Sequence, residues 1–226
     1  MSRIRKALEQ RELKNPDGLS RVLLDVIKSE QLAEKAVLDV GCGWGRLTLA
    51  LAPDAGRLIG IDRDERAVAR ARELALAGSF ANVEFRVEDA ESIDYRDLGA
   101  FDMVVANLCM SDAVIWRASL VLGPGACLIF ACFHTDQWKE TGKVSPFAYD
   151  KLHLESELNK NGFRVEQIEV ERDVVEFASV DEALWAVEGM RSKWEKDGRW
   201  DNYVAYLANG GRQLTRSHLI VKARKR

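Results

Sequence analysis

Short apolar segments alternate with amphipathic helical segments along most of this chain, and that alternation constrains the fold more than any other feature. Seven segments have the composition of strands, at residues 36–40, 58–61, 83–87, 101–106, 126–133, 163–170 and 214–223. Over the first five, a new strand begins roughly every 20 to 30 residues, with helical periodicity in between. This order predicts a mostly parallel sheet with helices on both faces.

Length and composition limit the class of protein. The 226 residues are 47% apolar and 31% charged, which suits one large domain, or one domain with an appended cap, rather than two domains with full cores of their own. No apolar run approaches the roughly 20 residues that cross a bilayer, and the N-terminus is charged throughout, so we expect a cytoplasmic protein without a membrane segment. The four cysteines form no CxxC pair, which argues against a zinc site or a disulfide framework. The net charge of -3 argues against a polyanionic partner such as nucleic acid.

One loop carries the strongest chemical signal. The segment V37-L38-D39-V40-G41-C42-G43-W44-G45 places three glycines between a predicted strand and a predicted helix. Glycines at such a turn let backbone N–H groups and the helix N-terminus approach a ligand closely. Asp62 ends the next strand, 21 positions after Gly41 (62 minus 41), where a carboxylate can accept hydrogen bonds from both hydroxyls of a ribose. The pattern therefore predicts a nucleoside site.

The charge around the loop distinguishes between nucleoside ligands. A triphosphate site would need Gly-Lys-Ser/Thr, whereas Gly45 is followed by Arg46-Leu47-Thr48. A dinucleotide would bring its pyrophosphate beside Asp39, and two like charges at about 4 Å cost on the order of 4 kcal/mol at an effective dielectric near 20. The same carboxylate favours a cationic arm. The loop thus points to a ligand with an ammonium and a sulfonium rather than to NAD.

Five motifs in order make the chain resemble the class I S-adenosylmethionine-dependent methyltransferases over about residues 19–171. Residues 39–45 resemble the family's first motif, which holds the methionine arm, and residues 59–62 resemble the second, with Asp62 on the ribose. The run E88-D89-A90 resembles the third, which implies that Asp89 contacts the adenine amino group and the Ala90 backbone its ring edge. Residues 101–107 resemble the fourth, which ends beside the methyl group, and residues 121–125 resemble the turn before the fifth strand.

The resemblance implies an α/β, Rossmann-like, doubly wound fold with a seven-stranded, mostly parallel sheet, an antiparallel last strand, helices on both faces and a small helical cap. It implies S-adenosylmethionine as the cofactor, S-adenosylhomocysteine as its product, and one methyltransferase domain over residues 1–226. Within it we expect N-terminal helices (1–35), a cofactor-binding core (36–171), a helical cap (172–213) and a final strand with a basic tail (214–226). The cofactor-binding residues would be Asp39, Gly41, Cys42, Gly43, Gly45, Asp62, Arg63, Asp89, Ala90, Asn107 and Leu108.

The expected reaction is direct displacement on the sulfonium methyl by a small-molecule acceptor, with alignment supplying most of the acceleration. A base is needed only if the acceptor is protonated. His134 is the catalytic candidate because it follows the fifth strand and histidine titrates near neutrality. Asp112, Asp136 and Tyr149 are further candidates, and we expect no metal site.

The predicted cap at residues 172–213 has the most bearing on the acceptor. A capping box, Ser179 to Glu182, opens it. One hypothesis is a lid with aromatic walls for a planar or cationic metabolite. The alternative is that its helices pack their aromatic rings against the sheet edge or against a second copy, so the protein is expected to be a monomer or a homodimer. The aromatic residues concerned are Trp185, Trp194, Trp200, Tyr203 and Tyr206.

Two other functions stay open at this point. An RNA or protein methyltransferase would use the basic residues at the two ends, although the acidic total opposes it. A regulator that binds S-adenosylmethionine without catalysis would need the same Asp39 and Asp62. The basic residues are Arg3, Arg5, Lys6 and Arg11 at the start and Lys222, Arg224, Lys225 and Arg226 at the finish.

Overall fold

The computed structural model describes residues 19–226, and its centre is one sheet in the strand order β3-β2-β1-β4-β5-β8-β7, with a short β6 paired to β5. The pairs among β1 to β6 are parallel, and β8 runs antiparallel to both β5 and β7. The expected fold class is thus confirmed. The strands are β1 (Ala36–Val40), β2 (Arg57–Asp62), β3 (Val83–Val87), β4 (Phe101–Asn107), β5 (Leu122–His134), β6 (Ala148–Tyr149), β7 (Phe163–Glu176) and β8 (Gln213–Lys225).

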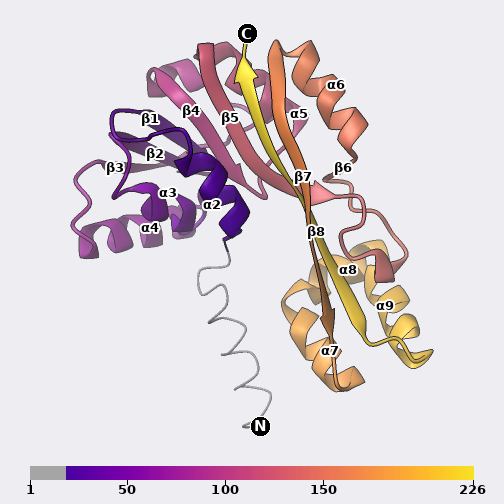
Figure 1. Ribbon diagram of the computed structural model, residues 1–226. Coiled ribbons are helices and arrows are strands. Elements are labelled where there is room, and N and C mark those ends of the chain that lie inside the picture. Colours follow the sequence, from indigo (N-terminus) through magenta and orange to yellow (C-terminus); the bar gives the residue numbers. More distant parts are fainter. Residues whose placement is uncertain (1–18) are drawn as a thin grey trace.

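Helices lie on both faces of the sheet (Figure 1). Within residues 19–226, none is long and apolar enough to span a bilayer. The α-helices are α2 (Arg21–Lys28), α3 (Arg46–Leu51), α4 (Glu65–Ala77), α5 (Asp112–Val121), α6 (Lys151–Lys160), α7 (Val180–Val187), α8 (Arg191–Asp197) and α9 (Arg199–Ala208). The described residues also contain three short 3-10 helices: η1 (Tyr95–Leu98), η2 (Lys139–Thr141) and η3 (Glu188–Met190).

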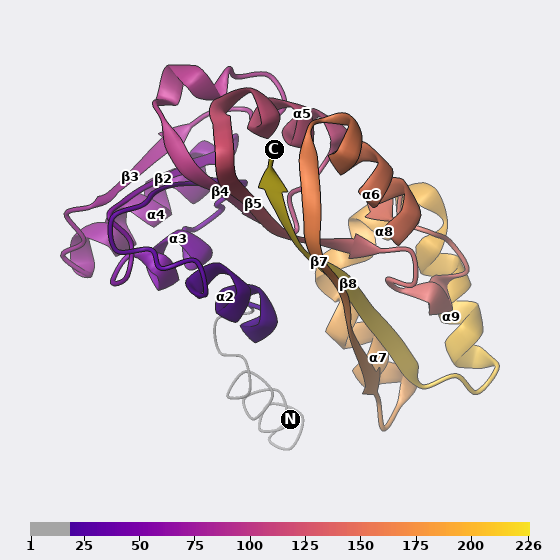
Figure 2. The same ribbon diagram turned by 45° about the horizontal axis from the view of Figure 1, so that its top comes forward.

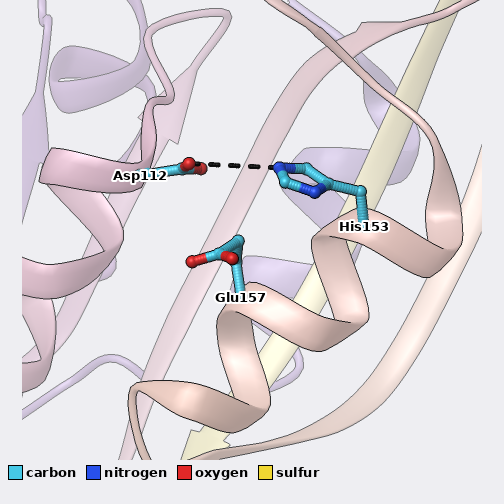
Figure 3. Close-up of side chains that lie close together, drawn as sticks. All are labelled: Asp112, His153 and Glu157. Atoms are coloured by element: carbon cyan, nitrogen blue, oxygen red, sulfur yellow. Dashed lines mark ion pairs between the residues drawn. The ribbon is translucent and has the colours of Figure 1, made fainter.

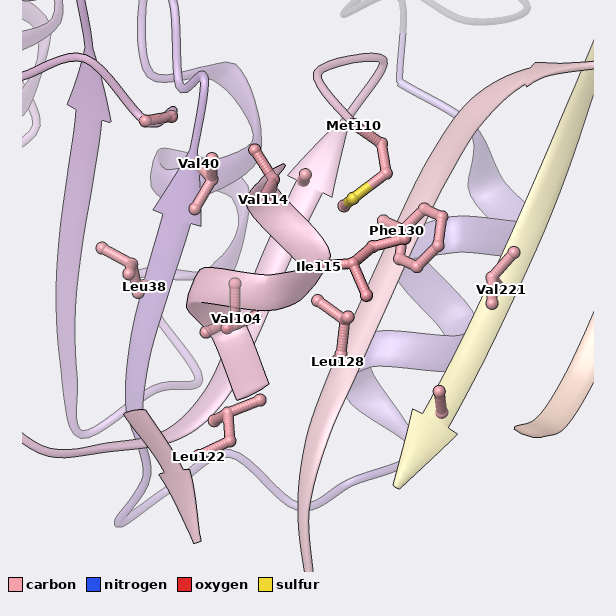
Figure 4. Packing of buried hydrophobic residues seen from close by; sticks show 14 of the residues in the cluster. Leu38, Val40, Val104, Met110, Val114, Ile115, Leu122, Leu128, Phe130 and Val221 are labelled. Carbon is pink, nitrogen blue, oxygen red and sulfur yellow. The ribbon is translucent and has the colours of Figure 1, made fainter. Parts of the chain in front are cut away.

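Side-chain alternation along the central strands divides the interior into two cores. In β5, Cys127 and Ile129 belong to the core shared with α2 and α3, whereas Leu128 and Phe130 belong to the core shared with α5 and α6. Figure 4 shows the second core, in which Ile115 of α5 lies over Leu128 and Phe130. Both faces of these strands are buried, which explains why the strands read as nearly continuous apolar runs.

The structure has one strand more than the sequence predicts. The additional strand, β6, has only two residues and pairs in parallel with the end of β5. A strand this short leaves no periodicity to detect in the sequence. Helix α6 begins directly after it, at Lys151, with Asp150 as its N-cap. By contrast, the predicted capping box is confirmed, since Ser179 accepts from Glu182 N at 3.1 Å. Asp64 likewise caps α4 by accepting from two of its backbone N–H groups.

A long antiparallel hairpin of β7 and β8 carries the helical cap away from the rest of the sheet (Figures 1 and 2). The two strands pair from Phe163 opposite Lys225 to Glu176 opposite Gln213, whereas β5 pairs with β8 only over residues 218–224. Helices α7, α8 and α9 lie against the outer end of the hairpin. Both strands therefore run further than the sequence predicts, because their outer halves are stabilised by the cap.

The cap has its own aromatic core. Trp194 and Tyr203 are almost completely buried there, with ring centroids 5.8 Å apart, and Trp138 packs on Trp194 at 5.3 Å. The hairpin contributes Val175 and Leu214 to the same cluster. These buried rings pack on one another, so the hypothesis that the aromatic residues form the walls of an acceptor chamber is wrong for them. The two-stranded outer part of β7 and β8 cannot form a core alone, and the aromatic rings of the cap provide the core against which it packs.

The basic residues at the end of the chain do not form a free tail. They lie in or directly after β8, and two of them pair with acids: Lys222 with Glu30 at 2.6 Å, and Arg224 with Glu30 at 2.6 Å and Glu166 at 2.7 Å. Lys222 and Arg224 are two residues apart on β8, so their side chains lie on the same face of the sheet, near Glu30 and Glu166. The linear sequence does not show this proximity. The other basic cluster, from Arg3 to Arg11, lies outside the described residues, as does the first half of the segment 1–35.

We expect the variant Trp194→Ala to lose about 3 to 5 kcal/mol of unfolding free energy, because it empties the centre of the cap core. Trp185, on the neighbouring α7, is 61% exposed, so Trp185→Ala should change stability by no more than about 0.5 kcal/mol. Urea denaturation followed by circular dichroism measures both. Equal losses in the two variants would contradict a cap core centred on Trp194.

Candidate cofactor and acceptor site

The glycine loop lies between β1 and α3, at the carboxyl end of the parallel strands. Gly41 and Gly43 both have positive φ, 71° and 52°, which favours glycine. A Cβ atom on Gly41 would lie 2.2 Å from the sulfur of Cys109, whereas a Cβ on Gly43 would meet nothing within 4 Å. The loop therefore packs tightly against β4's end at Gly41 and is open to a ligand at Gly43.

Asp39 is the buried charge of this site. It is 1% exposed, and its Oδ2 accepts a hydrogen bond from Thr48 Oγ1 of α3 at 2.5 Å. Its Oδ1 is buried and has no donor within the described part of the chain. Burial raises the pKa of Asp39 to about 7, an effect that the Thr48 hydrogen bond opposes only in part. Asp39 Oδ1 can therefore accept a hydrogen bond from a ligand. If the donor is a cation, it also lowers the free-energy cost of burying the charged carboxylate.

Asp62, at the end of β2, ties the glycine loop to the start of α4. Its Oδ2 accepts from Gly43 N at 2.8 Å, and its Oδ1 accepts from Asp64 N at 2.9 Å. A carboxylate oxygen can accept more than one hydrogen bond, so both oxygens keep capacity for ligand hydroxyls. Asp62 is thus held in one orientation before any ligand binds.

The remaining predicted cofactor residues follow the neighbouring strands. Asp89 closes a turn after β3, with its Oδ1 accepting from Glu91 N at 2.9 Å, and the Ala90 carbonyl accepts from the Tyr95 hydroxyl at 2.9 Å. Asn107 ends β4, and Leu108 after it has a φ of 60°, a strained value for a non-glycine residue. At Leu108 the chain leaves the direction of β4 and turns out of the sheet, at the edge formed by the carboxyl ends of the parallel strands.

Two adjoining cavities lie at this edge. The first, called the loop cavity, has about 610 Å³ and is lined by Asp39, Cys42, Gly43, Trp44 and Asn107, among others. The second, called the outer cavity, has about 470 Å³ and is lined by Arg63, Asp89, Ala90, Leu108, Cys109, Met110, Cys132, Phe133, Phe147 and Lys193, among others. Gly41 and Asp62 line both, so the two cavities meet at those residues.

The structure brings together most of the residues expected from the sequence, but not all. Gly45 and His134 line neither cavity. Gly45 instead caps α3 with a φ of 79°. Sequence reasoning missed Thr48, whose hydrogen bond to Asp39 crosses nine positions from strand to helix. It also missed Phe147 and Lys193, which come from a loop and from the cap and carry no local signal of their own.

His134 lies at the end of β5 and contacts β8. Its Nδ1 is 3.0 Å from Ser217 Oγ and receives a hydrogen bond from Asp136 N at 3.4 Å. Burial and the nearby cation of Arg172 lower the pKa of His134, which favours the neutral ring. If Nδ1 accepts from the Asp136 backbone, the ring hydrogen lies on Nε2, and no nitrogen lone pair is free to act as a base.

One group of potential metal ligands occurs in residues 19–226: Asp112, His153 and Glu157 (Figure 3). His153 and Glu157 lie one turn apart on α6, and Asp112 begins α5. Each carboxylate already has a partner, since Asp112 accepts from the Tyr149 hydroxyl at 2.7 Å and Glu157 pairs with Lys160 at 2.5 Å. His153 and Asp112 are also largely exposed. We assign no ion to this group.

Comparison with known protein families identifies the chain. A family model described as a methyltransferase domain matches residues 32–202. The chain belongs to this family. Membership confirms the expected enzyme class and the expected cofactor, S-adenosylmethionine. The matched range includes the glycine loop, Asp62, strands β1 to β5, at whose ends the two cavities lie, and most of the cap.

Individual relatives of this methyltransferase resemble it over shorter stretches. A ubiquinone biosynthesis O-methyltransferase of Acinetobacter baylyi is 31% identical over 105 residues, which is 44% of each protein. A tRNA (uracil-5-)-methyltransferase homolog of Mus musculus is 47% identical over 57 residues, 25% of this chain and 9% of the relative. The chain thus covers less than half the length of these curated relatives.

Solved structures match the methyltransferase over nearly its whole length. The YcgJ protein of Bacillus subtilis has a TM-score of 0.69 at 18% identity, covering 90% of this chain and 97% of that one. A protein described as a putative methyltransferase from Bacillus halodurans has a TM-score of 0.66 at 20% identity, covering 90% and 98%. At these identities the likeness concerns the fold.

The residues of the loop cavity fit the cofactor on their own chemistry. S-adenosylmethionine carries an ammonium on its methionine arm, and Asp39 Oδ1 is a buried acceptor without a donor. Its ribose has two hydroxyls, and Asp62 is a fixed carboxylate at the junction of the cavities. A diphosphate would instead bring its phosphate oxygens, which accept hydrogen bonds, against Asp39 Oδ1, which also accepts.

We expect the affinity for S-adenosylhomocysteine to rise with pH up to about pH 7 and then level off. Below its pKa of about 7, Asp39 is protonated in the free protein and must lose that proton to bind the ligand's ammonium. Affinity should therefore fall by up to about tenfold for each pH unit below 7. Calorimetry between pH 5.5 and 7.5 measures the slope.

The variant Asp39→Asn is the control for this slope. It should bind more weakly at pH 7.5, lose the pH dependence, and melt no lower than the wild type because the buried charge is gone. The same slope in wild type and variant would show that another group titrates.

Proposed function

We propose that this methyltransferase transfers a methyl group from S-adenosylmethionine to a small organic acceptor that binds in the outer cavity. The observation that carries the proposal is the meeting of two cavities at Gly41 and Asp62. One surrounds a buried acid and the glycine loop, and the other has an apolar side lined by Met110, Phe133 and Phe147. The bound cofactor supplies a methyl group already activated by its sulfonium. The chain's residues have to bind, orient and exclude water.

Each predicted cofactor residue has a role in this proposal. Asp39, with Gly41 and Gly43, would hold the methionine arm, and Asp62 the ribose. Asp89, Ala90 and the adjacent Arg63 would contact the adenine, since they line the outer cavity on the β3 side. Asn107 and Leu108, at the end of β4, would lie beside the methyl group. Cys42 lines the loop cavity, and Gly45 acts through the turn into α3.

Alignment is the catalytic contribution that the site supports best. The outer cavity presents Met110, Phe133 and Phe147, apolar groups that can hold an acceptor and displace water from it. Two reactants held in line recover roughly 7 to 11 kcal/mol of the barrier without any acid or base. For His134 the contacts favour a positioning role, in which it joins β5 to Ser217 of β8.

The proposal includes a cytoplasmic location, with which four free thiols are in keeping. It also includes a monomer or homodimer. An RNA substrate is less well supported, because Lys222 and Arg224 are engaged with Glu30 and Glu166. The enzyme should form S-adenosylhomocysteine from S-adenosylmethionine when supplied with a pool of small metabolites. Binding without any turnover would favour a non-catalytic regulator.

We expect Asp62→Asn to weaken S-adenosylhomocysteine binding by about 10- to 100-fold, since a charged acceptor is lost from the ribose. Asp94→Asn is the matched control, because Asp94 also accepts from a backbone N–H two residues on, at 3.0 Å, but lines neither cavity. Calorimetry measures both, and thermal melts check folding. Equal weakening by the two substitutions would argue against Asp62 as a ligand contact.

For His134 we expect the variant His134→Gln to retain kcat within about threefold, because a general base would contribute about 100-fold or more. The measurement is turnover against pH with whichever metabolite fraction supports the reaction. A loss of about 100-fold together with the disappearance of a pH-dependent limb would show that His134 is the base after all.

A further inference from the structure

The outer cavity has two halves of different chemistry. Glu88, Asp89 and Glu91 follow β3 at one side, and Met110, Phe133 and Phe147 line the other side. In the sheet, β2 and β1 lie between β3 and β4, so Gly41 and Asp62 separate the acidic half from the apolar half. The acidic half belongs with the proposed adenosine site. The apolar half is the space left for the acceptor.

The cap contributes one residue to this lining, Lys193 of α8. The cap is carried by β7 and β8, which follow β5 in the sheet order, so Lys193 reaches the cavity from the side opposite β3. Within residues 19–226, Lys193 has no hydrogen bond or ion pair, whereas Arg191 on the same helix pairs with Glu195 at 2.8 Å. An exposed cationic residue without a partner among the described residues therefore belongs to the lining of a largely apolar acceptor space.

A cation in that position discriminates between acceptors by charge. Lys193 is exposed, so a neutral acceptor would remove only part of the water around its ammonium, but it would offer no partner in return, which costs free energy. An acceptor with a carboxylate or phosphate would replace that water with an ion pair. Such a penalty against the wrong ligand is an effective source of specificity.

We propose that the acceptor is an apolar, preferably aromatic, molecule with an acidic group, and that Lys193 binds this group. The proposal rests on the proposed function, because it assumes that the apolar half of the outer cavity holds the acceptor. Phe133 and Phe147 contact the acceptor's body, and the acidic group points toward the cap. Lys193 determines specificity and takes no part in the displacement itself.

The experiment uses the full chain saturated with S-adenosylhomocysteine and two pairs of probes that differ only in charge: benzoate with benzamide, and 4-phenylbutyrate with 4-phenylbutyramide. Binding of the cofactor product is first confirmed by calorimetry, and probe binding is then measured by saturation-transfer NMR titration. We expect at least one carboxylate to bind about tenfold more tightly than its amide. The preference should disappear in Lys193→Gln and persist in Lys196→Gln, which removes a cation from the same helix outside the cavity lining.

The outcomes separate the two proposals. Failure of S-adenosylhomocysteine to bind would overturn the proposed function and this inference with it. Product binding without a carboxylate preference, binding of neither probe pair, or a preference that survives Lys193→Gln would overturn the inference alone. Loss of the preference in both variants would show a general effect of charge on α8 rather than a contact by Lys193.

Discussion

The carboxylate of Asp39 is the constraint on which the site depends. Asp39 lies two residues after Val37 on β1, so the two side chains share a face of the sheet. Helices α2 and α3 cover this face, and the neighbouring strands place apolar side chains there. Burying an acid there is costly unless its charge is neutralised or paired. Thr48 pairs one oxygen, and the other lies beside the loop cavity without a donor. A cationic ligand that donates a hydrogen bond to Asp39 Oδ1 would therefore lower the free-energy cost of burying this carboxylate.

The strand order explains why the other ligand-binding candidates gather around this acid. The chain runs outward from β1 to β2 and β3, then returns to the other side of β1 with β4 and β5. At such a reversal the loops leave the strands in opposite directions and open a crevice at their carboxyl ends. Asp39, Asp62 and Asn107 come from three adjacent strands at that point. Their proximity follows from topology, and Asp62 then links two of the loops through hydrogen bonds.

The sequence was informative wherever function coincides with a local signal. Glycines after a buried strand and acids at strand ends are signals over a few residues, so Asp39, Gly41 and Asp62 could be proposed as site residues from the sequence, whereas Asp89 followed only from the family resemblance. Long-range contacts have no such signal. The aromatic residues of residues 172–213 could equally line a cavity or fill a core, and only packing against Val175 and Leu214 of the hairpin decides the question. Likewise, the basic end of the chain reads as a tail until its pairing with Glu30 and Glu166 is seen.

The separate cores have a consequence for specificity. The loop cavity and the acidic half of the outer cavity lie at the carboxyl ends of β1 to β4, and the core clusters beneath these strands contain no cap residue. The apolar half takes its lining from the ends of β4 and β5, from the loop that contains Phe147, and from α8. Cap residues such as Lys193 can therefore change without disturbing the core that supports Asp39 and Asp62. Under the proposed function, this arrangement would let the acceptor change through the cap while the cofactor site is kept, because the cap has a core of its own.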